Sequence, residues 1–416
     1  MKIGIVGLGY VGLPLACLFA KKKIHVIGFD ISKNRIEKLL LGQDTNNDFL
    51  EKDFINNKYL DFTYNLKDIK DCEIYIITVP TPIKSNKKPN LTPLAKASLF
   101  VGKVISKKNI VIYESTVYPG CTEEFCIPII EKESNLIFNK DFFCGYSPER
   151  ISPGDKKRTL EQIVKVTSGS NSKIAKKIDK LYNKIIKAGT YLAPSIKIAE
   201  ASKIVENIQR DVNISLMNEF SMIFEKIGID TKEVLSAAKT KWNFLDFKPG
   251  LVGGHCIGVD PYYLAYKAEL LNYTPKLILS GRKINDKMGK HISDVIYRLI
   301  KKKNFKIQNL KTLILGITFK ENCADIRNSR VFDLYRELTK IGLKPDIIDP
   351  IADRELVEKK IKLKLIKKIN FKYDIIIYAV AHKEFKLINF DKISKKNSII
   401  YDVKSILPKN KISARL

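Results

Sequence analysis

The sequence is poor in the residues that build metal centres and disulfide frameworks. Its seven cysteines form no Cys-x-x-Cys pair, and the chain holds only four histidines. Clustered Cys and His ligands mark zinc sites, and regular Cys spacing marks small secreted domains, so both classes are disfavoured and no metal is expected. Any cysteine that matters for function is expected to act as a thiol.

Long apolar runs are also missing. No stretch approaches the roughly 20 consecutive apolar residues that cross a bilayer, which argues against an integral membrane protein. The apolar N-terminus carries closely spaced glycines and lacks the small-residue cleavage site of a secretory signal. We therefore expect a cytoplasmic protein with no membrane partner.

Acidic residues are in deficit: Lys plus Arg is 74 and Asp plus Glu is 45, which gives a net charge of +29. Such an excess admits a nucleic-acid partner. However, the lysines are spread along the chain, and runs such as Lys21–Lys23 and Lys301–Lys303 fall at the ends of expected elements. No nucleic-acid-binding module is recognisable, so a lysine-rich solvated surface is favoured and no nucleic acid is expected.

What is present is a repeated alternation of short β-rich runs and helical segments, typical of parallel sheets wrapped by helices. A helix is expected over Leu13–Lys22. With 416 residues, of which 45% are hydrophobic, the chain can form several cores. The expected strands are Lys2–Val6, His25–Phe29, Glu73–Val79, Ile110–Glu114, Phe142–Gly145, Lys311–Leu315, Pro345–Ile348, Asp374–Ala379 and Ser398–Tyr401.

Between these two α/β parts, apolar residues from Ile198 to Phe224 recur at helical spacing for about thirty residues without Gly or Pro. This predicts a long helix that bridges two domains and pairs with a second subunit, giving a homodimer. The fold class is therefore α/β, with two Rossmann-like doubly wound domains joined by a long central helix. The expected boundaries are 1–193 for an N-terminal α/β domain, 194–300 for a helical dimerisation domain, and 301–416 for a C-terminal α/β domain.

A glycine-rich turn follows the first strand. Gly7, Gly9 and Gly12 form a Gly-x-Gly-x-x-Gly pattern that opens a helix, and Asp30 ends the next strand. In this context the pattern predicts a pyrophosphate at the helix N-terminus and a ribose at the carboxylate. The charge of Asp30 would repel a 2′-phosphate, so NAD is favoured over NADP. The alternative is a glycine turn that serves packing alone.

A second glycine-rich loop, residues 250–261, contains His255, Cys256 and Asp260. Glycines give close backbone access to a thiol, and neighbouring N–H groups lower the pKa of such a thiol and hold an oxyanion. A nucleophilic Cys256 is therefore possible by residue type, and so is a buried cysteine in a tight turn. His255 could equally be a hydrogen-bonded core residue.

Several longer motifs resemble those of the nucleotide-sugar 6-dehydrogenases, the UDP-glucose and GDP-mannose dehydrogenase superfamily. The resemblance covers essentially the whole chain. The residues of the motifs are most like those of the bacterial branch that acts on UDP-N-acetylhexosamines for surface polysaccharides. The motifs are GIVGLGYVGLPLA, ESTVYPG (114–120), YSPERISPG (146–154), EASKIVEN (200–207), GLVGGHCIGVDPYYL and GITFKENCADIR (316–327).

The resemblance implies a four-electron oxidation of a sugar at carbon 6, with two NAD reduced in turn. Cys256 matches the nucleophile that carries a thiohemiacetal and then a thioester. Lys203 and Asn207, one helical turn apart, match the groups that stabilise the oxyanions. Asp260 matches a carboxylate that works with Lys203 and a water, and Glu149 matches a base for thioester hydrolysis.

The resemblance also implies ligand contacts. Thr116 positions water and touches the cofactor, and Trp242 is either near the sugar pocket or a core or interface anchor. The implied cofactor residues are Gly7, Gly9, Tyr10, Val11, Gly12, Asp30, Arg35, Pro80, Thr81, Thr116 and Arg327. The implied substrate residues are Glu149, Arg150, Lys203, Asn207, Gly253, Arg282, Lys320 and Lys404, the last in place of a common Arg.

Two positions depart from the UDP-glucose branch. Pro153 stands where that branch has a second Glu, and Val259 stands where it has a Lys, so the roles of those residues cannot be transferred. The favoured substrate is a UDP-N-acetylhexosamine, and UDP-glucose or GDP-mannose is the alternative. Two further alternatives are a basic nucleic-acid-binding protein and a catalytically inactive structural relative; the retained Cys256 and Lys203 argue against the latter.

Overall fold

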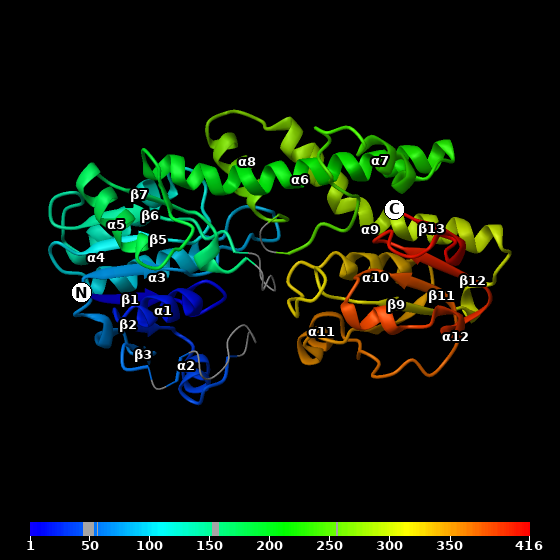
Figure 1. Ribbon diagram of the computed structural model, residues 1–416, viewed down its shortest axis with the longest axis horizontal. Coiled ribbons are helices and arrows are strands. Elements are labelled where there is room, and N and C mark those ends of the chain that lie inside the picture. The colour runs from blue at the N-terminus through cyan, green and yellow to red at the C-terminus, as the bar shows by residue number, and fades with distance from the viewer. Residues whose placement is uncertain (45–53, 56, 152–157, 255–256) are drawn as a thin grey trace. The chain divides into compact units, whose positions relative to one another are not determined.

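The computed structural model describes residues 1–44, 54–55, 57–151, 158–254 and 257–416 (Figure 1). The chain forms two compact units. Unit 1 consists of Met1–Glu206 and Tyr262–Tyr273, and unit 2 consists of Asn207–Pro261 and Thr274–Leu416.

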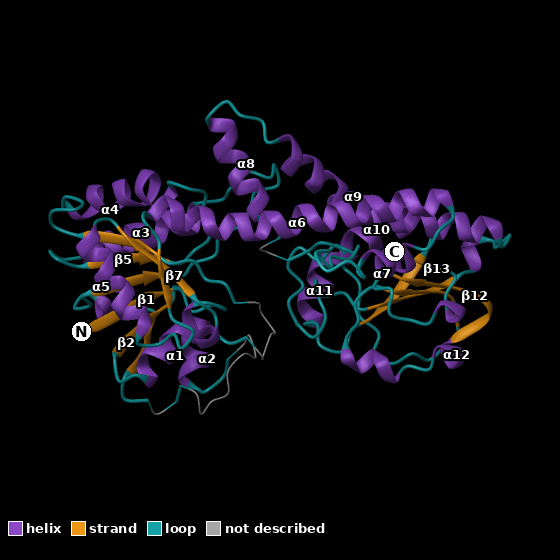
Figure 2. Ribbon diagram, turned by 45° about the horizontal axis from the view of Figure 1, so that its top comes forward, coloured by secondary structure: helices purple, strands orange, loops and turns teal. Residues whose placement is uncertain are grey.

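Each unit is an α/β structure built on a mainly parallel sheet, which confirms the predicted fold class (Figure 2). Each expected strand is present, and their ends mostly agree within two residues, although β12 begins earlier than expected, at Ser394. The division into the three domains 1–193, 194–300 and 301–416 stays a prediction.

The sheet of unit 1 has the strand order β3-β2-β1-β4-β5-β6-β7-β8, and its neighbours run parallel except β6 and β7. The strands are β1 (Lys2–Val6), β2 (His25–Phe29), β3 (Leu60–Thr63), β4 (Ile74–Ile77), β5 (Ile110–Tyr113), β6 (Phe143–Tyr146), β7 (Lys165–Gly169) and β8 (Thr190–Leu192). The helices are α1 (Gly12–Lys21), α2 (Lys33–Leu40), α3 (Thr92–Val104), α4 (Ile127–Ser134), α5 (Ser172–Asn183) and most of α8 (Asp260–Leu270).

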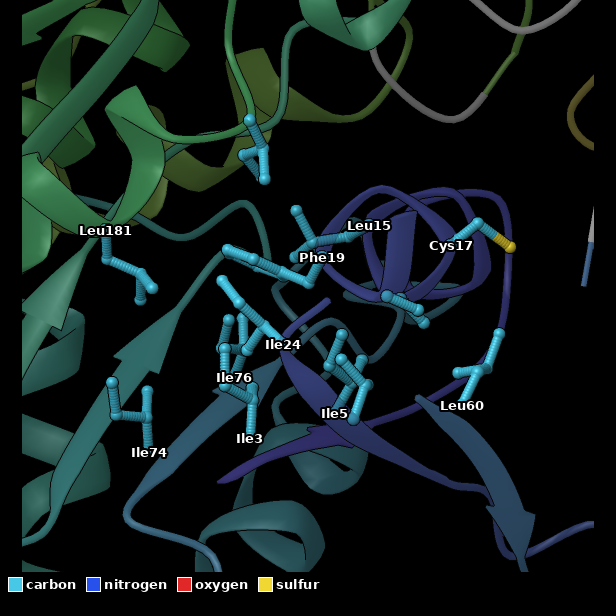
Figure 3. Packing of buried hydrophobic residues seen from close by; sticks show 14 of the residues in the cluster. Ile3, Ile5, Leu15, Cys17, Phe19, Ile24, Leu60, Ile74, Ile76 and Leu181 are labelled. Carbon is cyan, nitrogen blue, oxygen red and sulfur yellow. The ribbon is translucent and has the colours of Figure 1, made fainter. Parts of the chain in front are cut away.

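The core of unit 1 forms where β-branched strand residues meet the apolar side of α1. Ile3 and Ile5 of β1 belong to one buried cluster with Leu15 and Phe19 of α1 (Figure 3). Each of these side chains is at most 1% exposed, and burial of each is worth about 1.5–3 kcal/mol. This packing holds the start of α1 against the end of β1, where the glycine turn lies.

The chain order in unit 1 reverses between β1 and β4, which are neighbours in the sheet. In open α/β sheets, ligands bind outside the carboxyl ends of the strands at such a reversal. The glycine turn follows β1 and the segment 78–81 follows β4, so the topology brings both to the expected ligand edge.

Helix α6 spans Ile196–Ile227, which is 32 residues and confirms the predicted long helix. Its residues up to Glu206 belong to unit 1 and the remainder belong to unit 2. Buried side chains such as Ile204 and Met217 pack inward. Five apolar side chains on the helix are largely exposed: Ile198, Val205, Leu216, Ile223 and Ile227.

The sheet of unit 2 has the order β10-β9-β11-β12-β13, and all of its paired strands run parallel. The chain order reverses between β9 and β11. The strands are β9 (Lys311–Leu315), β10 (Lys344–Ile348), β11 (Tyr373–Tyr378), β12 (Ser394–Asp402) and β13 (Ala414–Arg415). The helices are the rest of α6, α7 (Thr231–Ala238), α9 (Lys276–Lys302), α10 (Val331–Lys340), α11 (Arg354–Ile361) and α12 (Phe390–Ile393).

No helix among the described residues is long and apolar enough to cross a membrane. The cysteines that the structure describes are all buried and none forms a disulfide, namely Cys17, Cys72, Cys121, Cys126, Cys144 and Cys323.

Candidate active site

The turn between β1 and α1 requires glycine at two positions for different reasons. Gly7 has a φ of +96°, a conformation that L side chains rarely adopt, and its N–H donates to the carbonyl of Phe29 (2.8 Å). A Cβ on Gly12 would lie 1.9 Å from the carbonyl oxygen of Gly7. By contrast, a Cβ on Gly9 would meet no heavy atom within 4 Å. The first and last glycines therefore shape the turn, and the middle one leaves open space above it.

Asp30 faces this turn. Its carboxylate accepts hydrogen bonds from the N–H groups of Leu8 and Ser32, both at 2.9 Å. Arg35 of α2 donates from Nε to the carbonyl of Leu8 (3.0 Å) and pairs with Asp44 (2.8 Å). The structure thus brings Asp30 and Arg35 to the turn, while Tyr10 and Val11 are half-buried within it.

The segment after β4 closes the other side of the turn. The Thr78 hydroxyl donates to the carbonyl of Gly7 (2.6 Å), a contact that the sequence analysis did not anticipate. Pro80 is exposed and Thr81 is half-buried directly after it. No local sequence pattern indicates that Thr78, directly after a strand, contacts a turn more than 70 residues away.

These residues fit a dinucleotide. The open space above Gly9 leaves room for such a ligand. The N-terminus of α1 supplies N–H dipoles for its pyrophosphate, and the Asp30 carboxylate supplies an acceptor for its ribose.

A second cluster lies at the carboxyl ends of β5 and β6. Lys165, the first residue of β7, donates to Glu114 Oε2 (2.7 Å) and Glu149 Oε2 (2.8 Å), and all three side chains are at most 7% exposed. The Tyr182 hydroxyl donates to Glu114 Oε1. Glu149 Oε1 accepts from the N–H groups of Arg150 (2.6 Å) and Ile151 (2.7 Å). The carboxylate of Glu149 is therefore fixed at both oxygens.

The same contacts, together with burial, shift the pKa values of the two carboxyl groups in opposite directions. Burial favours the neutral acid of Glu149, but the charge and hydrogen bond of Lys165, together with the two backbone N–H groups, lower its pKa below the ordinary value. For Glu114, burial prevails over Lys165 and raises the pKa. Burial opposes the charge of Lys165, yet the two carboxylates raise its pKa. Glu149 is thus the more acidic of the two carboxyl groups.

Thr116 and Arg150 lie near this cluster in the chain. Thr116 is half-buried, shortly after the end of β5. Arg150 pairs with Glu206 of α6 (2.8 Å) and donates to the carbonyl of Val164 (3.0 Å). Arg150 is therefore held between the end of β6 and α6.

Lys203 and Asn207 lie one turn apart on α6, as predicted, and both are buried. The Asn207 side-chain amide donates to Asp260 Oδ2 (2.5 Å), so the structure joins two of the predicted catalytic residues within unit 2. Asp260 is the first residue of α8 and is 2% exposed.

The predicted nucleophile Cys256 and its neighbour His255 lie outside the described residues, as does Pro153. Gly253 is described, and the carbonyl of the adjacent Gly254 accepts from the Asn328 side chain (3.2 Å). The start of the predicted cysteine loop therefore packs against the segment that precedes α10.

Arg282 is an internal residue of unit 2. It is 1% exposed, and its guanidinium pairs with Asp211 of α6 and Asp286 of α9, both at 2.5 Å. These two carboxylates account for its charge. Its predicted contact with a sugar or phosphate is not supported by this placement and stays a prediction.

The other predicted cations of unit 2 follow β9 or β12. Lys320 is half-buried after β9, and Arg327 forms a bidentate pair with Asp325. Lys404 pairs with Glu321 (2.6 Å), which places it beside the Lys320 segment. Trp242 is 91% exposed, so it is not a core residue of unit 2.

Comparisons with known proteins agree with this arrangement. Profiles of the UDP-glucose/GDP-mannose dehydrogenase family match the chain in three parts: the NAD binding domain at residues 1–186, the central domain at 197–287 and the UDP binding domain at 313–409.

Whole relatives match as well. The UDP-N-acetyl-D-glucosamine 6-dehydrogenase of Salmonella typhi is 51% identical over 420 residues, which cover 100% of this chain and 99% of that protein. Protein CapL of Staphylococcus aureus is 48% identical and covers 99% and 97% of the two chains. The structure of a UDP-D-ManNAc dehydrogenase from Pyrococcus horikoshii matches with a TM-score of 0.88 at 30% identity, covering 100% and 98%.

The three family profiles match most of the chain, a relative matches all of it, and the glycine turn and Asp30 fit a dinucleotide. The chain therefore belongs to the UDP-glucose/GDP-mannose dehydrogenase family and is an NAD-dependent nucleotide-sugar dehydrogenase.

Proposed function

We propose that this enzyme oxidises carbon 6 of a UDP-N-acetylhexosamine to a carboxylate, a four-electron reaction that consumes two NAD. The observation that carries this choice is the 51% identity, over the whole chain, to a protein named UDP-N-acetyl-D-glucosamine 6-dehydrogenase. Relatives named UDP-N-acetyl-D-mannosamine dehydrogenase are only 30–34% identical. The difference in sequence identity favours a glucosamine-type substrate over a mannosamine-type one.

When bound, NAD accepts a hydride in each oxidation. The chain contributes binding: the N–H groups of the turn and of α1 face the pyrophosphate, and Asp30 accepts from the ribose hydroxyls. The negative charge of Asp30 disfavours a 2′-phosphate. Tyr10, Val11, Arg35 and the Pro80–Thr81 segment line the same turn.

Cys256 forms the covalent intermediates. Its thiolate attacks the C6 aldehyde of the first oxidation to give a thiohemiacetal, which loses its hydroxyl proton and a hydride to NAD and so becomes a thioester. Water then hydrolyses the thioester, releasing the carboxylate and the free thiol. Lys203 and Asn207 stabilise the negative oxygen that develops at C6 in each of these steps.

Glu149, Asp260 and Thr116 act on the water that hydrolyses the thioester. Glu149 is ionised and fixed in place, so it can accept a proton from water during thioester hydrolysis. Its lowered pKa makes it a weak base, so its contribution is chiefly to orient the water. Asp260, held by Asn207, supplies a second acceptor, and Thr116 positions the water and touches the cofactor.

The UDP part of the substrate is proposed to bind unit 2 through Lys320 and Lys404. A diphosphate requires two or more cations or helix ends, and lysines supply charge without bidentate geometry. Arg327 is proposed to face the NAD pyrophosphate. Gly253 and Arg150 are proposed to contact the sugar.

We further propose a homodimer formed through α6, because Val205 and Ile227 are 59% and 62% exposed on this helix. The described cysteines are buried and outside disulfides, which suits the cytoplasm, where thiols stay reduced. A UDP-activated uronic acid is a glycosyl donor, so the product would serve polysaccharide synthesis.

A substrate panel tests the proposal. Purified enzyme is given NAD and, in turn, UDP-N-acetylglucosamine, UDP-N-acetylgalactosamine, UDP-glucose and GDP-mannose, and the product is identified by mass spectrometry. We expect kcat/KM to be highest for a UDP-N-acetylhexosamine. A preference for UDP-glucose or GDP-mannose would contradict the substrate assignment.

A further inference from the structure

Three buried polar side chains meet at the carboxyl edge of the unit 2 sheet. Thr318 follows β9, Asp349 follows β10 and His382 follows β11; we call them the His382 cluster. None is more than 1% exposed. His382 Nε2 lies 3.0 Å from Thr318 Oγ1 and 3.1 Å from Asp349 Oδ2. The cluster therefore sits where the chain order of this sheet reverses, at the edge where ligands bind.

The contacts define the state of the imidazole. His382 Nδ1 lies 3.0 Å from the N–H of Asn322, which can only donate, so Nδ1 carries a lone pair. The Thr318 hydroxyl gives its hydrogen to the carbonyl of Lys320 (3.0 Å) and is therefore an acceptor toward His382. Nε2 must carry the hydrogen, so the ring is neutral and donates to Thr318 and Asp349.

The cluster fixes the segment that carries Lys320. Asp349 Oδ2 accepts from the N–H groups of Ile317 (2.7 Å) and Thr318 (3.3 Å), which holds the start of the segment. At its other end, Asn322 donates to His382 through its N–H and accepts from Lys383 N–H at its side-chain oxygen (3.0 Å). Lys320 lies between these two attachment points.

Asp349 contrasts with its counterpart in unit 1. Asp30 also ends the second strand of its sheet and accepts from a backbone N–H in the turn after the first strand, but it remains partly exposed. Asp349 is 1% exposed and is bonded to His382. A ribose cannot reach a carboxylate buried in this way, so Asp349 and His382 act on the segment rather than on a ligand.

We propose that His382 is a positioning residue for the UDP part of the substrate. Its two nitrogens hold the segment Ile317–Asn322 so that Lys320 presents its ammonium to the diphosphate. This inference rests on the proposed binding of UDP by unit 2.

UDP binding to the full-length protein, measured by isothermal titration calorimetry, tests the inference without requiring turnover. His382→Ala is expected to weaken UDP binding about tenfold. His382→Asn replaces Nδ1 with an amide oxygen that accepts from Asn322, so we expect affinity within about threefold of the wild type. His382→Gln keeps a donor at the Nε2 position only and should resemble His382→Ala.

His291→Ala is the matched control, because His291 also belongs to unit 2 and faces a carboxylate, Glu225 (3.6 Å). It should leave UDP affinity unchanged, and thermal unfolding of each variant reports its folding. Wild-type affinity in a folded His382→Ala, or equal affinities for the Asn and Gln variants, would overturn the inference. Failure of the wild type to bind UDP would instead contradict the proposed function.

The tautomer gives a test that requires no variant to fold. With only four histidines in the chain, the ring nitrogens of His382 can be assigned by ¹⁵N NMR of the wild-type protein. We expect Nδ1 to be unprotonated and Nε2 to be protonated at neutral pH. A protonated Nδ1 would overturn the inference.

Discussion

At the scale of single residues, Lys165 is a buried cation whose loss should destabilise unit 1. It is the shared cation of two buried carboxylates, Glu114 and Glu149. Lys165→Met leaves both without their partner, and removing one partner of a buried ion pair costs about 3–5 kcal/mol. We therefore predict a loss of that size in the free energy of unfolding, measured by urea denaturation.

Lys187→Met provides the comparison, because Lys187 pairs with Glu161 at 3.3 Å but is 69% exposed. Exposed pairs contribute about 0–1 kcal/mol, so this variant should unfold nearly as the wild type does. Equal losses in the two variants would contradict the role given to the buried cluster.

Glu200 of α6 predicts a pH dependence. Its carboxylate accepts from the N–H groups of Gly120 (2.5 Å) and Thr122 (2.9 Å), but burial raises its pKa to about 7. The folded protein holds the Glu200 carboxyl proton more tightly than the unfolded chain does. The contribution of this proton to the free energy of unfolding is therefore full below about pH 4.5 and is lost as the pH rises to about 7.

Glu200→Gln removes that titration. The variant should lose less stability than the wild type between pH 5 and 7, by about 3 kcal/mol at most. Chemical denaturation at several pH values measures this slope. Parallel pH profiles for the two proteins would show that Glu200 does not titrate in this range.

At the scale of elements, the turn between β1 and α1 predicts that alanine at two glycines weakens NAD binding but affects stability differently. Gly12→Ala places a Cβ against the carbonyl of Gly7 and should lower the unfolding temperature as well as NAD binding. Gly9→Ala meets only open space, so it should fold normally while weakening NAD binding about tenfold or more. Thermal unfolding and NAD titration separate the two. Normal NAD affinity in Gly9→Ala would contradict a pyrophosphate above this residue.

Elements with a strong local pattern could be predicted from the sequence. The β1–α1 turn follows from three glycines at fixed spacing, and α6 follows from apolar residues at helical spacing without Gly or Pro. Strand β7 was missed because KVTSG begins with a charge and ends in Ser and Gly. Lys165 was missed with it, since only the antiparallel pairing of β7 with β6 brings that residue to the carboxyl edge.

Long-range polar contacts were beyond prediction for the same reason. His382 is separated from Thr318 by 64 residues, and no local spacing relates them. Arg282 shows the converse: its motif suggested a ligand contact, whereas burial beside Asp211 and Asp286 gives it internal partners. The family could be predicted from the sequence because its motifs are local and occur along the whole chain. The long-range contacts could not, because they depend on the fold.

At the scale of the whole molecule, the excess of 29 positive charges acquires a specific interpretation. Both expected ligands, NAD and a nucleoside-diphosphate sugar, are anions, and a positive field raises their local concentration. The proposed binding requires only a few placed cations, such as Lys203, Lys320 and Lys404. Most of the other described lysines and arginines are exposed or half-buried and belong to the solvated surface.

The proposed dimer gives a prediction at the same scale. Val205 is 59% exposed on α6, and burying a glutamate at an apolar interface is unfavourable. Val205→Glu should therefore convert the dimer to a monomer, measured by light scattering after size-exclusion chromatography. An exposed position elsewhere, such as Lys173 of α5, serves as the control. A wild-type monomer, or an intact Val205→Glu dimer, would contradict an interface at this part of α6.

The most direct test of the central claim is the number of NADH molecules formed per UDP-N-acetylglucosamine consumed, compared between the wild type and Cys256→Ala. A four-electron oxidation through a thioester predicts two NADH per sugar and a uronate product for the wild type. Cys256→Ala should bind NAD normally and form no uronate. One NADH per sugar, or unchanged uronate formation by Cys256→Ala, would contradict the account.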